Sequence, residues 1–60
     1  MRSVARENAE EIFKHAELKK SELYQNKNEI RVQFEFNDNT ILLIKYDCSK
    51  LTKTYYVKKN

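Results

Sequence analysis

The clearest pattern in the chain is a strict alternation of apolar and polar residues over residues 30–36, Ile-Arg-Val-Gln-Phe-Glu-Phe. Successive side chains of a β-strand point to opposite faces of the sheet, so this alternation predicts a strand with one apolar face. Two further runs, rich in β-branched and aromatic residues, predict strands over residues 40–46 and 52–58. Polar segments typical of tight turns separate the runs, and we therefore expect a three-stranded antiparallel β-meander.

Residues 3–25 show a helical spacing of apolar residues instead. The apolar positions recur at intervals of three, four and seven, which places them on one face of a helix. These positions are Ala5, Ala9, Ile12, Phe13, Ala16, Leu23 and Tyr24. Ser3 is the expected N-cap, and the asparagines of segment 25–28 are typical of a helix C-terminus. The sequence thus predicts an α+β protein in which one N-terminal amphipathic helix packs on the meander.

The turn between the first two predicted strands decides which residues face the helix. A two-residue turn pairs Phe34 with Leu43, whereas a three-residue turn pairs Phe34 with Leu42. The three-residue turn gathers more apolar bulk on one face, and Asn39 tolerates the left-handed conformation that closes it. We therefore expect the second register; a slip of one residue would exchange the two faces of the strand.

In this register the run Ile41–Tyr46 is apolar on both faces of the sheet. The residues expected under the helix are Ile30, Val32, Phe34, Leu42, Ile44 and Tyr46, joined by Leu51, Tyr55 and Val57 if the second turn has four residues. The reverse face is expected to carry Gln33, Glu35, Thr54 and Tyr56 around two aliphatic residues. These two residues, Ile41 and Leu43, are left over from the core and are the candidates for an interface.

The chain length strengthens this interpretation. A chain of 60 residues makes one domain, and such a domain buries only about 60% of the surface that its unfolded form exposes. Cys48 is the only cysteine and His15 the only histidine, which excludes an internal disulfide and a zinc site built from Cys and His in one chain. Oligomerisation is the remaining common source of stability, so we predict a homodimer that uses Ile41 and Leu43.

The composition also excludes several classes of function. Glycine and proline are both absent, and without glycine the chain cannot form a phosphate-binding P-loop, a dinucleotide fingerprint or the loop of a KH module. His15 and Cys48 are the candidates for nucleophilic catalysis, but so short a chain hardly encloses an oriented base and an oxyanion site. We therefore expect no enzyme, no cofactor and no metal site.

The charge is unevenly distributed, and this suggests an alternative. The net charge is +3, and the whole excess lies in residues 30–60, with six basic and three acidic residues. Such a segment keeps a small protein soluble, but it also attracts nucleic acid or an acidic partner. A sheet that presents an aromatic ring among basic groups binds single strands in several small folds. The residues of this alternative nucleic-acid contact are Arg31, Lys45, Lys53, Tyr56, Lys58 and Lys59.

The location of the protein follows from its N-terminus and its apolar runs. The first residues lead into charged sequence with no apolar signal region, and the longest apolar run, Ile41–Ile44, is far too short to cross a membrane. Together with a single thiol this predicts a cytoplasmic protein without membrane contact. The leading hypothesis is a small non-catalytic interaction module, homodimeric, with an accessory or regulatory role.

Overall fold

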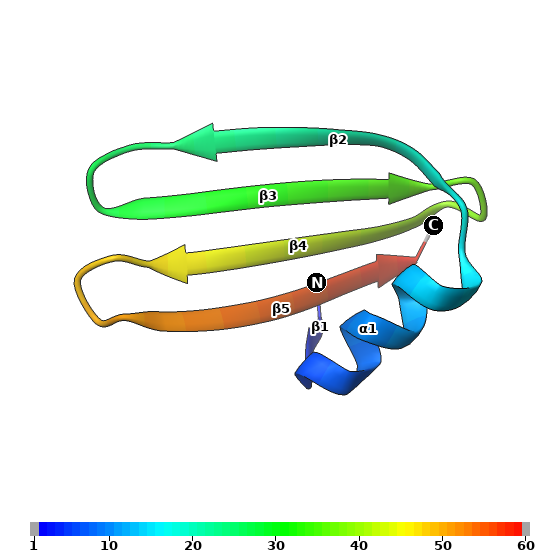
Figure 1. The fold of residues 1–60 in the computed structure, drawn as a ribbon, viewed down its shortest axis with the longest axis horizontal. Helices are drawn as coiled ribbons and strands as arrows, with labels where there is room; N and C mark the ends of the chain where they lie inside the picture. Colours follow the sequence, from blue (N-terminus) through cyan, green and yellow to red (C-terminus); the bar gives the residue numbers. More distant parts are fainter. Residues whose placement is uncertain (1, 60) are drawn as a thin grey trace.

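The computed structural model describes residues 2–59, which form one helix and one five-stranded sheet (Figure 1). The elements are β1 (Arg2–Val4), α1 (Arg6–His15), β2 (Leu18–Gln25), β3 (Glu29–Phe36), β4 (Thr40–Asp47) and β5 (Thr52–Lys59). The strand order is β1-β5-β4-β3-β2, and every neighbouring pair is antiparallel. The four long strands follow one another as a meander, and the short β1 joins the far edge beside β5. None of the described helices is long and apolar enough to cross a membrane.

The prediction of a three-stranded meander under a long helix is wrong. The sheet has five strands, and the helix expected over residues 3–25 ends at His15. A helix of that length would extend for about 35 Å, beyond the roughly 26 Å of an eight-residue strand, so its last turns would have no sheet to pack on. As the strand β2, residues 18–25 instead pair with β3, with one shift of register between Leu18 and Lys20. The α+β mixture is therefore right only in part, since one short helix accompanies a mostly β structure.

Both ends of α1 differ from the expected caps. Ser3 lies in β1, and Ala5 takes the N-cap position with no side-chain hydrogen bond. At the other end Ala16 is extended, with φ −113° and ψ 145°, and its N–H donates to the carbonyl oxygen of Ile12 at 2.9 Å. The carbonyl oxygen of Glu17 then accepts a bond from the N–H of Asn37 at 2.9 Å, which ties the start of β2 to the β3–β4 turn.

The predicted register between β3 and β4 is confirmed. Phe34 pairs with Leu42, as the three-residue turn requires. Asn39 has the expected left-handed backbone, with φ 68°, and its N–H donates to the carbonyl oxygen of Phe36 at 3.1 Å. Asp38 Oδ1 accepts the N–H of Thr40 at 3.0 Å. Hydrogen bonds from the hydroxyl and the N–H of Thr40 hold the pKa of the Asp38 carboxyl below its ordinary value.

The β4–β5 turn corrects one expected core residue. This turn has the four residues 48–51, because Asp47 pairs with Thr52 across it, and not the expected residues 47–50. Leu51 therefore lies in the turn itself, with φ 56° and 75% of its surface exposed, and does not join the core. Lys53 takes the position opposite Tyr46 on the same side of the sheet as α1.

The core occupies one half of the sheet face that α1 covers, which we call the helix-side face. Among the described residues, Ala9, Phe36 and Leu42 are the buried apolar ones. Phe13 closes this cluster from the helix, with its ring edge-on to the rings of Phe34 and Phe36 at 4.8 and 5.4 Å. The partly buried residues packed around it are Ile12, Ala16, Phe34, Ile44, Tyr55 and Val57. The core is therefore small and lies at the end of the sheet near α1 (Figure 1).

Candidate functional site on the open face of the sheet

Within residues 2–59 no element covers the sheet face opposite α1, and we call it the open face. Alternation along the paired strands places the following side chains there: Ser3, Lys20, Glu22, Tyr24, Glu29, Arg31, Gln33, Glu35, Ile41, Leu43, Lys45, Asp47, Thr52, Thr54, Tyr56 and Lys58. Because the four long strands contribute eight residues each, this face is broad and nearly as long as the molecule. It is the largest surface of the sheet that α1 leaves free.

Both predicted interface residues lie on the open face and are partly buried there. Leu43 lies near the centre, between Gln33 on β3 and Tyr56 on β5. Ile41 lies one row further along, between Glu35 and Lys58. The two aliphatic side chains therefore form a short apolar ridge along β4, with polar groups on either side.

Two shallow hollows of about 240 Å³ each flank this ridge. Both are lined by Leu43 and Arg31. The first hollow is completed by Glu22, Leu23, Tyr24 and Gln33, and the second by Lys45 and Tyr56. Leu43 thus stands between two depressions of similar size.

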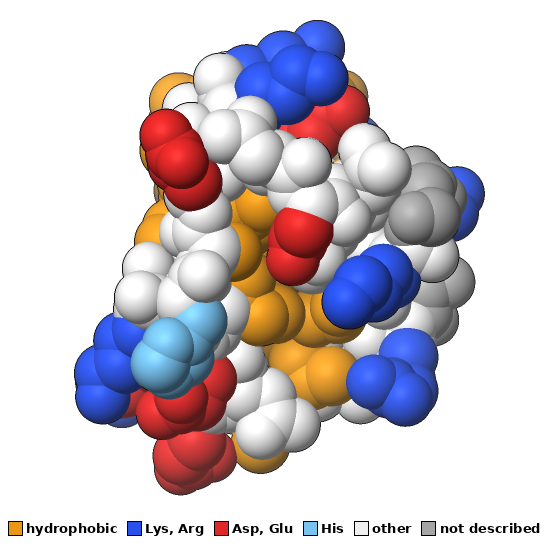
Figure 2. Space-filling model, turned by 90° about the vertical axis from the view of Figure 1, so that its right-hand side faces the viewer, with side chains coloured by type: hydrophobic (Ala, Val, Ile, Leu, Met, Phe, Trp, Pro, Cys, Tyr) orange, Lys and Arg blue, Asp and Glu red, His pale blue; other side chains and the backbone are white. Residues whose placement is uncertain are grey.

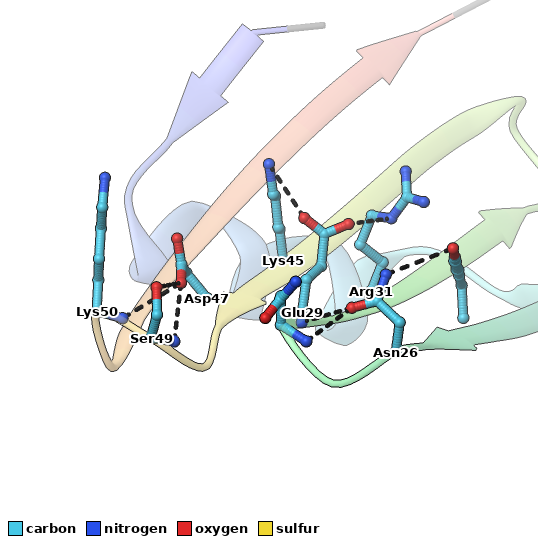
Figure 3. Close-up of polar contacts among 9 residues, drawn as sticks. Asn26, Glu29, Arg31, Lys45, Asp47, Ser49 and Lys50 are labelled. Carbon is cyan, nitrogen blue, oxygen red and sulfur yellow. Dashed lines mark hydrogen bonds and ion pairs between the residues drawn. The ribbon is translucent and has the colours of Figure 1, made fainter.

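An ion-pair network lies beside the ridge, centred on one acid (Figure 3). Glu29 Oε1 lies 2.8 Å from Arg31 Nε, and Glu29 Oε2 lies 3.4 Å from Lys45 Nζ. The buried Nε–H of Arg31 has no hydrogen-bond acceptor among the described residues, so its contact with Glu29 is electrostatic. The Arg31 guanidinium also stacks over the ring of Tyr24, 4.4 Å from the ring centre. One glutamate therefore compensates both basic groups at this end of the face.

The whole open face is electrically balanced. Lys20 extends the pattern on β2, because its Nζ lies 3.2 Å from Glu22 Oε1 and 3.8 Å from Glu35 Oε2. The four basic residues of the face are Lys20, Arg31, Lys45 and Lys58, and the four acidic ones are Glu22, Glu29, Glu35 and Asp47. The excess charge of the chain therefore lies elsewhere.

Side-chain caps fix the turns that position these residues (Figure 3). Asn26 Oδ1 accepts the N–H of Glu29 at 3.0 Å at the start of β3. Asp47 Oδ1 accepts the N–H and hydroxyl of Ser49 at 3.0 and 2.8 Å, and the N–H of Lys50 at 3.2 Å. The bonds from the Ser49 hydroxyl and the Lys50 N–H hold the pKa of Asp47 below its ordinary value.

The six residues of the alternative nucleic-acid contact do not share one surface. Arg31, Lys45, Tyr56 and Lys58 lie on the open face. Lys53 and Lys59 pair with Tyr46 and the buried Thr40, which places both lysines on the helix-side face. This separation follows from the alternation along β5, because Lys53 and Lys59 lie on the same side of the strand as Tyr55 and Val57, which were expected under the helix.

The candidate catalytic pair is also separated. His15 ends α1 and its Nε2 lies 3.0 Å from Glu11 Oε2, whereas Cys48 lies in the β4–β5 turn at the opposite end of the molecule (Figure 1). Its N–H donates to the carbonyl oxygen of Asn28 at 2.9 Å. Within residues 2–59 no group of three or more His, Cys, Asp or Glu side chains lies together as metal ligands would.

A third hollow, of about 320 Å³, lies between α1 and the sheet. Its apolar floor is formed by Ile12, Ala16 and Val57, and Glu11 and Lys59 are among the charged residues at its rim. Figure 2 shows this end of the molecule, with apolar side chains exposed between acidic and basic groups. Sequence reasoning missed the hollow, because its lining depends on where α1 ends and how it lies on β5.

Sequence reasoning also missed the part of the open face that β2 supplies. The polar residues Lys20 and Glu22 alternate with Ser21 and Leu23, which is a weak strand signal within a segment that also has helical spacing.

An apolar ridge with a balanced polar rim has the composition of a protein–protein interface. Comparisons with protein-family models, curated proteins and solved structures gave no match to this chain.

Proposed function

We propose that the protein is a small non-catalytic interaction module that works as a homodimer in an accessory or regulatory role. In this dimer the open faces of two copies stack back to back. The observation that carries the proposal is the apolar ridge of Ile41 and Leu43 between two hollows, on a face whose charges balance.

The shape of the face supports packing against itself. In a two-fold dimer the same patch lies on both sides of the interface, so it must be complementary to itself. Stacked sheets lie about 10 Å apart and interdigitate their side chains, which lets Leu43 of each copy enter a hollow beside Leu43 of the other. Equal numbers of basic and acidic residues allow the rims to pair without net repulsion.

The area of the face sets the expected affinity. Four strands about 4.8 Å apart and eight residues long give a face of roughly 26 by 19 Å, about 500 Å² per copy. The resulting total of about 1,000 Å² is near the lower limit for a specific interface. The monomer exposes 4596 Å², somewhat more than the roughly 4,200 Å² expected for a compact chain of 7.3 kDa. A weak dimer that forms at micromolar concentration or above is therefore expected.

Sedimentation equilibrium over a range of protein concentrations tests the proposal. Leu43→Lys places a charge on the ridge and should give a folded monomer, with folding checked by circular dichroism. Leu51→Lys is the matched control, since it makes the same change at a leucine that is 75% exposed in a turn, and it should leave the dimer intact. A native protein that stays monomeric at about 1 mM, or a dimer unaffected by Leu43→Lys, would contradict the proposal.

Nucleic-acid binding is the alternative, and one observation favours it. The rings of Tyr24 and Tyr56 lie on the open face near Arg31 and Lys45, as base stacking beside phosphate contacts would require. The pairing of both basic groups with Glu29 weighs against it, because neutralised charges attract phosphate less strongly. Salt-sensitive binding of DNA or RNA that is lost in Tyr56→Ala would favour this alternative, and no binding at low ionic strength would remove it.

A further inference from the structure

The helix-side face has a second half that α1 does not reach. α1 lies over the end of the sheet near the β3–β4 turn, and in the described part of the chain no helix covers the end near the β2–β3 and β4–β5 turns (Figure 1). We call the apolar surface at this end the uncovered half. Its residues are Leu23 on β2, Ile30 and Val32 on β3, and Tyr46 on β4.

The uncovered half is apolar and only partly shielded. Leu23 is 66% exposed, which is unusual for a leucine in a strand that faces the same side as the core. Ile30, Val32 and Tyr46 are partly buried by their neighbours in the sheet but lie outside the cluster around Phe36. The four side chains form a continuous surface, because Leu23 pairs with Val32 and Ile30 pairs with Tyr46.

The charge on this side of the sheet has one sign. In the described strands, the charged side chains that alternation assigns to the helix-side face are Arg2, Lys53 and Lys59, and all are basic. Lys53 pairs with Tyr46 and so lies at the border of the uncovered half. Arg2 and Lys59 lie at the covered end, opposite Val57 and Thr40, so Lys53 is the residue whose charge acts on the uncovered half. The charge at the border of the uncovered half is therefore basic, and it favours an acidic partner.

α1 shows which kind of element this face accepts. It has ten residues, packs through Ala9 and Ile12, and places Glu11 at the rim of the same hollow as Lys59 of the sheet. Figure 2 shows acidic and basic groups around the apolar floor at this end. At the covered end, α1 therefore already packs an apolar stripe on the sheet, and its Glu11 lines the same hollow as Lys59 of the sheet.

We propose that the uncovered half docks an acidic amphipathic helix of a partner protein, placed on the sheet beside α1. The apolar stripe of this helix would cover Leu23, Val32 and Tyr46, and its acidic flank would lie near Lys53. A helix of about ten residues is about 15 Å long, which matches the roughly 13 Å of strand that remains. The proposal does not depend on the open-face dimer, because the two surfaces lie on opposite sides of the sheet.

Two synthetic helical peptides with the same apolar stripe test this proposal, one with glutamates and one with lysines on the flank. Each is titrated up to about 1 mM into the ¹⁵N-labelled full chain, and amide shifts are mapped. The acidic peptide should shift the amides of Leu23, Ile30, Val32 and Tyr46, and the basic peptide should bind at least about 3-fold more weakly.

Two lysine variants of β5 test the role of charge. Lys53→Glu should weaken binding of the acidic peptide by about 3- to 10-fold. Lys58→Glu is the matched control, because Lys58 is an exposed lysine of the same strand on the open face, and it should leave binding unchanged. Equal effects of the two variants, no shifts at 1 mM peptide, shifts confined to the open face or equal affinity for both peptides would overturn the proposal.

One further variant separates this partner from a second copy of the chain. Ile30→Lys is chosen because Ile30 lines neither hollow of the open face. It should abolish binding of the acidic peptide and leave the sedimentation behaviour of the protein unchanged, with folding checked by circular dichroism. If Ile30→Lys instead dissociates a dimer, the uncovered half is the contact between copies and the proposal is overturned. The open-face proposal is decided separately by Leu43→Lys, so the failure of one proposal is distinguishable from the failure of the other.

Discussion

The two adjacent leucines of β4 provide a direct test of the fold. Leu42 is fully buried in the core and Leu43 lies partly buried on the open face, so the same truncation to alanine acts on opposite sides of one strand. Leu42→Ala removes packing against the cluster that includes Phe36 and leaves a cavity in a core that is already small. We therefore expect very different losses in the free energy of unfolding.

The expected losses follow from burial. A buried leucine truncated to alanine costs about 2–5 kcal/mol, whereas a partly buried one that loses about half of the same transfer energy costs roughly 1 kcal/mol. A 60-residue domain has a total stability of about 3–9 kcal/mol. Leu42→Ala should therefore remove roughly half of the stability of the protein, and Leu43→Ala should leave it folded with most of its stability.

Urea unfolding followed by far-ultraviolet circular dichroism measures both losses. The experiment is run at about 5 µM protein and repeated at tenfold higher concentration, so that any contribution from self-association is recognised. Equal losses for the two variants, or a larger loss for Leu43→Ala, would refute the assignment of the two residues to opposite faces. Such a result would mean that the register of β4 is shifted by one residue.

Two further predictions concern the turns. Asn39 and Leu51 both have positive φ, a conformation that asparagine tolerates better than leucine. Leu51→Asn should therefore raise the free energy of unfolding by about 1 kcal/mol, and Asn39→Leu should lower it by about 1 kcal/mol. The urea midpoints of the two variants check both changes. The pKa values of Asp38 and Asp47 are held below their ordinary 3.8 in the folded state, so their contribution is present above that pH and is lost as the pH falls through the folded values. Asp47→Asn keeps an acceptor oxygen without titrating, so its urea midpoint should fall less steeply between about pH 4 and pH 2 than that of the native chain; an unchanged slope would contradict this.

The sequence predicts those parts of the fold in which a strand has one buried face and one exposed face. β3 alternates strictly, and its pairing with β4 follows because Asn39 and the apolar bulk favour the same turn. The placement of Ile41 and Leu43 opposite the core follows from that pairing. For a strand in the middle of the sheet, the alternation of apolar and polar residues is thus enough to predict the strand and its buried face.

The sequences of the two edge strands, β1 and β2, show no such alternation. All eight residues of β2 are exposed, so its side chains experience little of the burial that imposes alternation, and the segment resembles a polar helix. β1 has three residues and owes its structure to a pairing with β5 at the other end of the chain. Tyr24 and Glu22 were missed as residues of the open face for the same reason, since they reach this face only through β2.

The pairing of β1 with β5 has a consequence for the order of folding. Arg2 pairs with Val57, so this contact closes a loop that spans nearly the whole chain, whereas the hairpins of the meander close loops of a few residues. The meander is therefore expected to form first, with β1 as the last strand to add. During synthesis, residues 2–4 leave the exit tunnel before their partners, residues 55–57, and have no strand to pair with until those residues have emerged. The segment that forms β1 therefore stays open and accessible to chaperones until the sheet is complete.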